Sequence, residues 1–445
     1  MKQTTIQLHT GFNIGQVDPR IFGGFLEHLG RAVYEGVYEP SSTLADPNGF
    51  RTDVLNSLKR LKMTAMRYPG GNFASGYHWL DGVGPGEKRP VARDLAWNSI
   101  EPNRFGTDEF IRLSREMDWI PMLTANLGTG TPEEAGNWVE YCNCPTGTRY
   151  ADMRAANGYD QPHDVKLWCL GNEMDGPWQL GHVPARDYAI RAQQAAKIMK
   201  DTSDFLASSA SIDRQIEEMD AACRFVQARR RSAKRTCLCF DEWNVSCDLS
   251  DSGSGCRFAP HLGEGIFTLQ DALVAGGFLH SFIRHADVLK IANLAQIVNV
   301  LAPILTRGDD MLLQSIFYPF EMFSKRREGI SLMLSADGPT YDSDSYGTVP
   351  VIDSSAILND GLLNVFVTNR SIDRSAEVTI RMADRSVASI ESAQILTGPN
   401  PRSANTFEQR DIVKSQPFAE AVVRNGEAVA ELPHLSLVAL TLKLT

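Results

Sequence analysis

The chain has 445 residues, of which 43% are hydrophobic and 22% are charged, enough material for one large domain and a smaller one. Its net charge of −10 argues against nucleic acid or an anionic membrane as a partner, because both attract basic surfaces. The first residues lack the apolar run of a signal peptide, and no run of about 18 apolar residues suggests a membrane span. We therefore expect a soluble, cytoplasmic protein.

Short apolar runs alternate with amphipathic segments up to about residue 325, a pattern typical of βα units and a parallel sheet. The expected strands are 21–26, 64–68, 120–125, 165–170, 236–240 and 288–292, nearly all apolar as if covered on both faces. Helices are expected at 53–61, 107–117 with Thr107 as its cap, 132–142, 185–200, 213–231 and 269–286. The basic run at 229–235 should end a helix, where cations complement its dipole.

The sequence pattern changes after about residue 329. Strand-like runs at 356–358, 363–368, 377–381, 387–395 and 435–444 are separated by turn residues, without a helical period. This pattern predicts an antiparallel β-sandwich. The fold class is therefore α/β, a TIM-type (β/α)8 barrel over residues 17–328 followed by a sandwich over 329–445. The strand-like N-terminal segment 1–16 is expected to join the sandwich.

Two segments place a glutamate directly after an apolar strand. They are Gly171-Asn172-Glu173 and Asp241-Glu242-Trp243-Asn244. Parallel α/β barrels assemble their active sites at the carboxyl ends of their strands. A pair of carboxylates in that position provides the two side chains that hydrolysis of a glycosidic bond requires. The two segments together predict a glycoside hydrolase.

The eight cysteines do not suggest a metal site. Cys142 and Cys144, like Cys237 and Cys239, are separated by one residue, whereas paired zinc ligands usually have two to four residues between them. Cys169 and Cys239 fall inside apolar strands, where a thiol behaves as a small hydrophobe. We expect reduced structural thiols.

Four motifs carry a resemblance to a known family: Phe22-Gly-Gly-Phe-Leu-Glu27-His28, Arg67-Tyr-Pro-Gly-Gly-Asn72, Gly171-Asn172-Glu173 and Phe240-Asp241-Glu242-Trp243-Asn244. They are similar to the signatures of family 51 glycoside hydrolases, the retaining α-L-arabinofuranosidases. Further similarity at 97–101, 285–287, 294–299 and 317–320 extends over nearly the whole chain. The family belongs to a clan of barrels with catalytic glutamates on strands four and seven.

The resemblance implies roles for particular residues. Glu173 would be the general acid/base and Glu242 the nucleophile of a double displacement, with Arg67 holding the nucleophile ionised. Two close carboxylates would also raise one pKa and keep the acid protonated. The implied substrate-binding residues are Glu27, Asn72, Trp97, Asn172 and Gln296. No metal or cofactor is implied, because two carboxylates suffice.

Simpler roles stay open for several of these side chains. A strand-end glutamate can cap the next helix, although two intact motifs favour catalysis. Arg67 can be only a buried ion-pair partner, and Trp97 can pack without contacting substrate. His28 and His285 are expected to be core histidines.

The interval between the two glutamates is shorter than the family requires. Catalysis on strands four and seven needs two further strands between them, and three βα units take roughly 90 residues. Glu242 follows Glu173 by only 69 positions, and the polar stretch after residue 200 contains no strand signal. We expect that strands five and six are missing between about Lys200 and Asp204, with a His and Tyr pair that the family carries there. Ser246-Cys247 also replaces aromatics that are common in the family.

The sequence therefore predicts a shortened barrel that releases terminal α-L-arabinofuranosyl residues from oligo- or polysaccharides. Its partner would be an arabinofuranosyl-containing substrate. The resemblance also implies a homo-oligomer, since relatives are commonly hexamers. Two alternatives stay open: another retaining glycosidase of the clan, such as a β-glucanase, and a catalytically impaired carbohydrate-binding protein.

Overall fold

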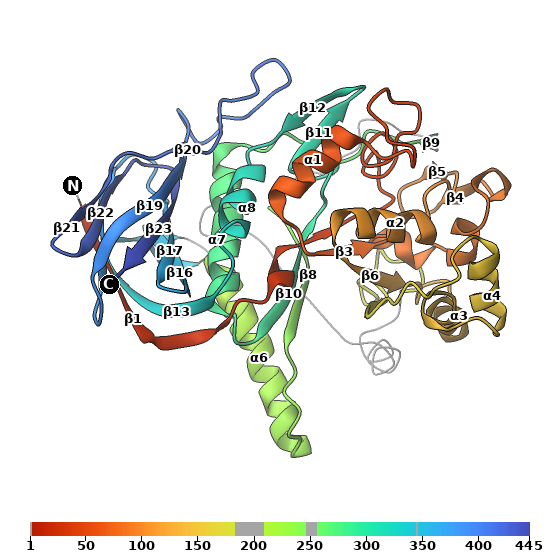
Figure 1. Cartoon of the computed structure of the whole chain (residues 1–445), viewed down its shortest axis with the longest axis horizontal. Coiled ribbons are helices and arrows are strands. Elements are labelled where there is room, and N and C mark those ends of the chain that lie inside the picture. The colour runs from red at the N-terminus through yellow and green to blue at the C-terminus, as the bar shows by residue number, and fades with distance from the viewer. Residues whose placement is uncertain (1, 183–208, 246–255, 344–345) are drawn as a thin grey trace.

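The computed structural model describes residues 2–182, 209–245, 256–343 and 346–445 (Figure 1). A curled parallel sheet of six strands forms the part that positions the predicted site. Its spatial order is β7 (Leu167–Leu170), β6 (Ile120–Ala125), β3 (Ala65–Tyr68), β2 (Gly23–Phe25), β10 (Leu289–Ala295) and β8 (Leu238–Trp243). All five neighbouring pairs are parallel. The six strands expected of the barrel are thus present, in a half-barrel.

The predicted starts of one strand and one helix were wrong in detail. The expected first strand begins as a short 3-10 helix, η1 (Pro19–Phe22), in which the Asp18 side chain accepts a hydrogen bond from the backbone of Arg20. Asp before Pro favours a helix start at this point. In the helix α2 (Thr107–Met117), the cap is Gly106 and not Thr107, because the Glu109 carboxylate accepts from the Gly106 N–H at 2.9 Å.

The other helices pack around the parallel sheet, lie between the two sheets or, in one case, project from the body (Figure 1). They are α1 (Thr52–Leu61), α3 (Pro132–Asn143), α4 (Arg149–Ala156), α6 (Ala210–Arg230), α7 (Leu269–Arg284) and α8 (Phe317–Ser324). The helix expected at 185–200 lies outside the described residues. Within the part of the chain that is described, no helix combines the length and the apolar character needed to cross a membrane.

The strands β7 and β8 are the two edges of the parallel sheet. The curl brings them together through side chains: the Sγ of Cys169 in β7 lies 3.5 Å from the Oδ1 of Asp241 in β8. Cys169 is buried as expected, but Cys239 is exposed. The prediction for Cys239 was wrong because β8 is an edge strand, so no described strand covers its outer side. The two edge strands are also only partly buried.

The second sheet has ten strands and lies at the opposite side of the molecule from α3 and α4 (Figure 1). Its order is β20 (Gln416–Pro417), β19 (Val387–Leu396), β23 (Ser436–Leu444), β17 (Leu362–Asn369), β16 (Ile352–Asn359), β13 (Ile330–Asp337), β1 (Lys2–Gln16), β18 (Ala376–Met382), β22 (Glu427–Leu432) and β21 (Ala421–Arg424). All pairs are antiparallel except β1 with β18. The sheet folds over so that β19 contacts β21 and β22, which encloses a core of its own. The division at residues 328 and 329 stays a prediction.

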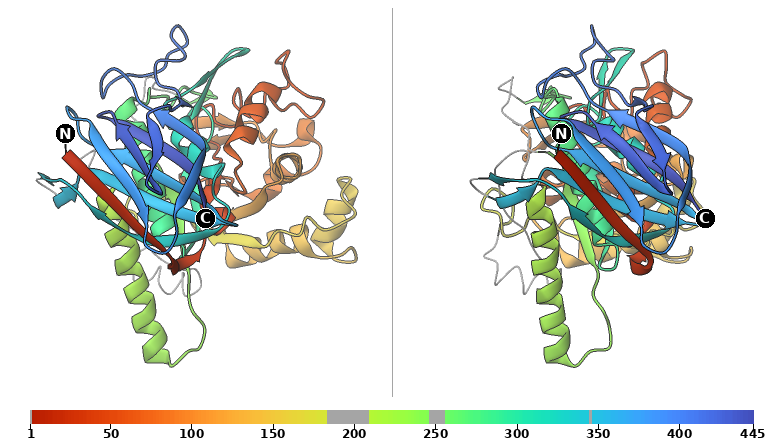
Figure 2. Two further views of the ribbon diagram at one scale, coloured as in Figure 1. Left: turned by 60° about the vertical axis from the view of Figure 1, so that its left-hand side comes forward. Right: turned by 90° about the vertical axis from the view of Figure 1, so that its left-hand side faces the viewer.

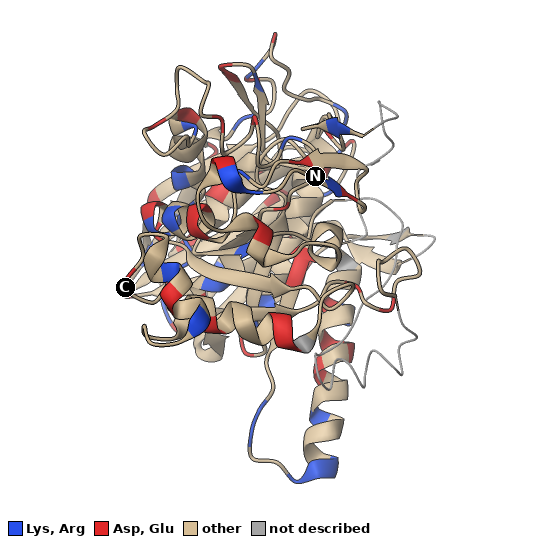
Figure 3. Ribbon diagram, turned by 90° about the vertical axis from the view of Figure 1, so that its right-hand side faces the viewer, with Lys and Arg blue, Asp and Glu red and all other residues tan. Residues whose placement is uncertain are grey.

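The helix α7 joins the two sheets, because it packs on β16, β17 and β13 and also lies in the core of the parallel sheet. The helix α6 contacts α7 at one end and stands out from the body in both views of Figure 2. Its far end carries the basic run, visible in Figure 3, and the helix stops at Arg230 with Arg231 as its cap. The prediction that this run ends a helix is confirmed.

An ion-pair network fastens α7 to the second sheet and to α6. Arg284 of α7 pairs with Asp353 of β16 and with Asp213 of α6, each at 2.7 Å. Burial alone would raise the pKa of Asp353, but the guanidinium groups of Arg284 and Arg370 outweigh burial and hold that pKa well below its usual value. The folded state is therefore stabilised by the ionised carboxylate.

We expect Asp353→Asn to lower the free energy of unfolding by about 3 kcal/mol at pH 7, because it leaves a buried cation unpaired. A folded-state pKa below 3.8 means that this stabilisation is complete above about pH 4 and is lost as the pH falls further. Urea unfolding at pH 7 and pH 3 would test this. A difference between variant and wild type that is the same at both pH values would contradict it.

Candidate active site

The two glutamates predicted to be catalytic come together where the edge strands meet. Glu242 lies in β8, and Glu173 lies three residues after the end of β7. A tight turn directs Glu173, since Gly171 and Glu173 have positive φ angles of 85° and 42°. The negative charge of Glu173 acts on the pKa of Glu242. The two motifs therefore lie close enough in the described residues for their charges to interact.

The Arg67 side chain connects the two motifs. Arg67 is fully buried in β3, and its Nη1 donates to the Glu242 carboxylate while its Nη2 donates to the Oδ1 of Asn172 at 2.9 Å. The guanidinium group also lies over the ring of Phe25, 4.6 Å from its centroid. One cation thus contacts the nucleophile candidate on β8 and the residue before Glu173.

The environment of Glu242 combines opposing effects on its pKa. Burial raises that pKa, the Arg67 cation lowers it, and the charges of Glu173 and Asp241 raise it again. The result is a pKa above the usual glutamate value. The carboxylate is therefore held in place by Arg67, whose charge favours its ionised form against the effects of burial and of the neighbouring acids.

The predicted binding residues Glu27, Trp97 and Gln296 form one hydrogen-bonded group. The Oε1 of Glu27 accepts from Trp97 Nε1 at 3.1 Å and from the Phe73 backbone at 3.0 Å. Its Oε2 accepts from Gln296 Nε2 at 2.9 Å. Burial raises the pKa of Glu27 to about 7. Three segments distant in sequence thus converge on one buried carboxyl group.

Asn72 lies between this group and Glu173. Its Oδ1 accepts from Asn172 Nδ2 at 3.3 Å and from the amide of Gln179. Gln179 also donates to the Oε2 of Glu173 at 3.2 Å, and Trp178 Nε1 donates to the same oxygen at 2.8 Å. The structure therefore brings together all eight predicted site residues, either directly or through one neighbour.

Trp178 and Gln179 were not predicted from the sequence as site residues. Their position within six residues of Glu173, in a loop that follows a strand end, was the available signal. The role of the two glycines that follow Pro69 was not predicted either. A Cβ atom on Gly70 would lie 2.4 Å from Cγ of Glu27, and one on Gly71 would lie 3.2 Å from Oε1 of Glu242. These glycines allow the loop to approach both carboxylates.

We expect Gly71→Ala to lower kcat/KM roughly tenfold, because a displacement of the Glu242 carboxylate by a few tenths of an ångström disturbs the reacting geometry. The melting temperature should change little. The matched control is Gly136→Ala, since a Cβ there meets nothing within 4 Å and should leave the kinetics unchanged. Wild-type kinetics for Gly71→Ala would show that this approach is not needed for turnover.

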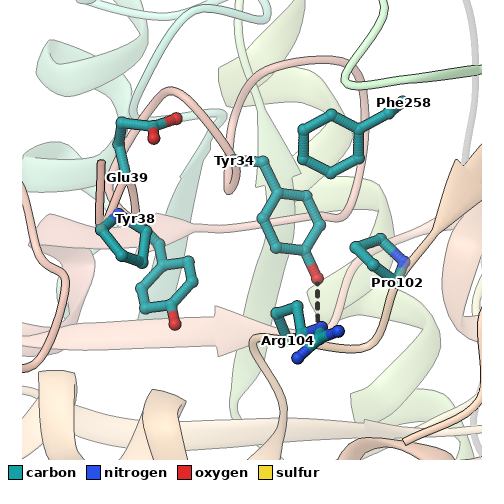
Figure 4. A pocket seen from close by; sticks show the side chains of 7 residues that line it. Tyr34, Tyr38, Glu39, Pro102, Arg104 and Phe258 are labelled. Carbon is teal, nitrogen blue, oxygen red and sulfur yellow. Dashed lines mark hydrogen bonds between the residues drawn. The ribbon is translucent and has the colours of Figure 1, made fainter. Parts of the chain in front are cut away.

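A surface cavity of about 320 Å³ has a lining that contains none of the predicted site residues. Figure 4 shows its lining by Tyr34, Phe258, Pro102 and neighbouring side chains, with the Tyr34 hydroxyl accepting from the Arg104 backbone at 3.1 Å. Tyr34 also donates to Glu101, which pairs with His28 at 2.8 Å. His28 is thus a buried, paired histidine, as expected.

No cluster of His, Cys, Asp and Glu suited to a metal ion is present among the described residues. Ser246 and Cys247 lie outside them.

A curled parallel sheet with two glutamates at the carboxyl ends of its strands is the arrangement of barrel glycoside hydrolases. The comparisons with known proteins agree. The family model described as Alpha-L-arabinofuranosidase 1 domain matches residues 57–235, and the one described as Alpha-L-arabinofuranosidase C-terminal domain matches residues 241–436. The chain belongs to glycoside hydrolase family 51, the α-L-arabinofuranosidases, and is an enzyme.

Individual relatives cover most of the chain. An intracellular exo-α-(1→5)-L-arabinofuranosidase of Acetivibrio thermocellus is 39% identical over 84% of this chain and 86% of its own length. A protein of the same description from Bacillus subtilis is 36% identical over 96% of each chain. The structure of a family 51 α-L-arabinofuranosidase from Bifidobacterium longum superposes with a TM-score of 0.92 at 33% identity, covering 99% of this chain and 100% of that one.

The alignment with the Bacillus subtilis relative also supports a deletion. It extends over 482 positions, more than the 445 residues of this chain. The relative therefore carries residues that this chain lacks. The expected location of the deletion, between Lys200 and Asp204, lies outside the described residues.

Proposed function

We propose that the enzyme is an exo-acting, retaining α-L-arabinofuranosidase that releases terminal arabinofuranosyl residues from oligo- or polysaccharides. The observation that carries this proposal is the contact of one buried guanidinium group, Arg67, with both Glu242 and Asn172. This contact joins the two glutamate motifs at one place in the shortened sheet. The names of the relatives, exo-α-(1→5)-L-arabinofuranosidases, supply the substrate class.

In the first half of the reaction, Glu242 attacks the anomeric carbon of the terminal sugar and forms a glycosyl ester. The bond to the leaving oxygen breaks at the same time, and Glu173 donates its proton to that oxygen. Arg67 holds the attacking carboxylate, and its charge favours the ionised form before attack. For this double displacement the two carboxyl groups are expected to lie about 5 to 5.5 Å apart in the substrate complex.

In the second half, Glu173 accepts a proton from a water molecule, and the resulting hydroxide attacks the anomeric carbon. The ester bond breaks, and Glu242 is released as a carboxylate. The product keeps the anomeric configuration of the substrate. Trp178 and Gln179, which donate to the same oxygen of Glu173, would hold this carboxyl group in place through both halves.

The remaining site residues would bind the sugar ring. Asn172 is the candidate for the 2-hydroxyl, where hydrogen bonds strengthen in the transition state. Glu27, Asn72 and Gln296 would bind the other hydroxyls, and Trp97 would form a wall. The mutual hydrogen bonds of Glu27, Trp97 and Gln296 support this group as a preformed subsite. No metal or cofactor has a place in this scheme.

We further propose a cytoplasmic location, in line with the relatives named as intracellular enzymes. The partners would be the arabinofuranosyl-containing substrate and further copies of this chain, with a hexamer as one assembly. Neither nucleic acid nor a membrane surface is expected as a partner, because the net charge is −10.

The proposal is tested by following the hydrolysis of α-1,5-linked arabinotriose with ¹H NMR. We expect arabinose and arabinobiose as the first products, with the α-furanose anomer of arabinose appearing before mutarotation. Release of the β-anomer first would exclude a retaining mechanism. Cleavage of an aryl β-glucoside instead would favour another activity of the clan.

A further inference from the structure

A β-bulge in β8 turns two neighbouring acidic side chains toward the same cation. Along the β8–β10 ladder, Phe240 pairs with Ala292 and Trp243 pairs with Leu294. Asp241 and Glu242 therefore lie opposite a single residue, Asn293. Adjacent side chains of a regular strand point to opposite faces, whereas a bulge can direct both to one side and is common beside active sites.

The bulge is supported by a buried side chain. Asn293 is fully buried, and its Nδ2 donates to the backbone carbonyl of Asp241 at 3.1 Å, so that the carbonyl has a partner outside the regular ladder. A Cβ atom on Gly23 would lie only 2.3 Å from the Oδ1 of Asn293. The space for Asn293 thus requires a glycine on the neighbouring strand.

Asp241 contacts the side of Arg67 that Glu242 does not use. The Oδ2 of Asp241 forms an ion pair with Arg67 at 3.3 Å from Nε, and the same Nε–H donates to Sγ of Cys169 at 3.4 Å. Nη1 faces Glu242 and Nη2 faces Asn172. The guanidinium group is planar and rigid, so a contact at Nε determines where the two outer nitrogens point. Two carboxylates thus share one buried cation.

We propose that Asp241 is a positioning residue, which holds Arg67 by Nε so that the same guanidinium group presents its outer nitrogens to Glu242 and Asn172. This inference rests on the proposed role of Glu242 as the nucleophile. Asp241 acts through Arg67 and does not contact the sugar. It also supplies a second negative charge beside Arg67, and this charge raises the pKa of Glu242.

Several ionisable groups surround this arrangement. The thiols of Cys169 and Cys239 lie 3.5 and 3.6 Å from Asp241, and Arg67 lies between the two acids. Glu173 and Asp241 each raise the pKa of Glu242 by their charge, and Glu242 in turn raises the pKa of Glu27. Removing the charge of Asp241 therefore favours the ionised form of Glu242, and its pKa should fall.

Two substitutions of Asp241 distinguish the effect of its contact with Arg67 from the effect of its negative charge. Asp241→Ala removes both, and kcat should fall roughly ten- to a hundredfold through misplacement of Arg67, with KM near the wild-type value. Asp241→Asn keeps an oxygen acceptor for Arg67 but removes the charge. The acidic limb of the kcat/KM profile should then move to lower pH, with a smaller loss of kcat.

The matched control is Asp18→Asn, which removes an Asp–Arg pair of 2.7 Å before the start of β2, at the opposite ends of the strands. It should lower the melting temperature without moving the acidic limb. A purely structural role for Asp241 would give this same pattern. Wild-type kcat and an unmoved acidic limb for Asp241→Ala would overturn the inference, whatever the melting temperature.

A direct titration keeps this test independent of turnover. In protein labelled with carboxyl-¹³C glutamate, the Glu242 signal is identified by its loss in Glu242→Gln, and its pKa should be lower in Asp241→Asn than in wild type. An unchanged pKa would overturn the inference even if Glu242 is the nucleophile. Conversely, full activity of Glu242→Ala would contradict the proposed function but leave this titration as a test of the Asp241–Arg67–Glu242 coupling.

Discussion

Glu242→Ala should lose roughly 10⁴- to 10⁶-fold in kcat on 4-nitrophenyl α-L-arabinofuranoside, because it removes the carboxylate on Nη1 of Arg67 that is proposed to form the glycosyl ester. Glu242→Gln keeps the shape of the side chain and an acceptor for Arg67, and should be comparably inactive. Circular dichroism and the melting temperature of the Gln variant would show that the loss is chemical.

Sodium azide should restore part of the activity of Glu242→Ala. Azide fits the space left by the carboxylate and attacks the anomeric carbon from that face, while Glu173 still protonates the leaving group. One displacement gives the β-L-arabinofuranosyl azide, with inverted configuration, and ¹H NMR identifies this product. An α-configured azide from this variant would show that Glu242 is not the nucleophile.

Glu173→Ala should lose about 10²- to 10⁴-fold on arabino-oligosaccharides, whose leaving groups need a proton. On an aryl arabinoside with an acidic phenol the first step should be far less affected. The glycosyl ester would then accumulate, and KM should fall together with kcat. Steady-state kinetics on the two substrate classes would reveal this contrast. An equal loss of kcat/KM on both classes would contradict an acid/base role, because kcat/KM reports the first step.

Azide should also act on Glu173→Ala, but with the opposite stereochemistry. It would attack the glycosyl ester in place of the unactivated water and give the α-azide with overall retention. The pair of azide products, β from Glu242→Ala and α from Glu173→Ala, assigns the two glutamates without reference to any other protein. The same anomer from both variants would not fit a double displacement.

The strands of the parallel sheet were predictable because their apolar runs and flanking turns are local features. The run at 120–125 coincides with β6 (Ile120–Ala125), and the run at 64–68 differs from β3 (Ala65–Tyr68) by one residue. The residues that cap the helices were harder to predict from the sequence. Gly106 replaces Thr107 as the cap of α2 because Glu109 reaches back to the backbone, a contact that competes with any hydroxyl cap.

The grouping of Glu27, Trp97 and Gln296 was implied by a family resemblance and not by spacing, since 269 positions separate Glu27 from Gln296. Tertiary contacts of this kind have no local signal. The same holds for Asp241, because the alternation of a regular strand would point it away from Glu242. Only the bulge against Asn293, which depends on the register of two strands, turns it toward Arg67.

The exposure of Cys239 has a similar origin. Its apolar neighbours predict burial on both faces, which holds only if a strand covers the outer side of β8. In the described residues β8 is an edge strand. The short interval between Glu173 and Glu242 therefore carried more information about this edge than the composition of the strand did.

The central claim is that a shortened barrel still brings Glu173 and Glu242 into one working site. The most direct measurement is the hydrolysis of 4-nitrophenyl α-L-arabinofuranoside by the purified protein, with intact mass spectrometry confirming a chain of 445 residues. Turnover by wild type that collapses in both Glu173→Ala and Glu242→Ala is the predicted result. A folded chain of the correct mass that binds arabinose without turnover would contradict the claim.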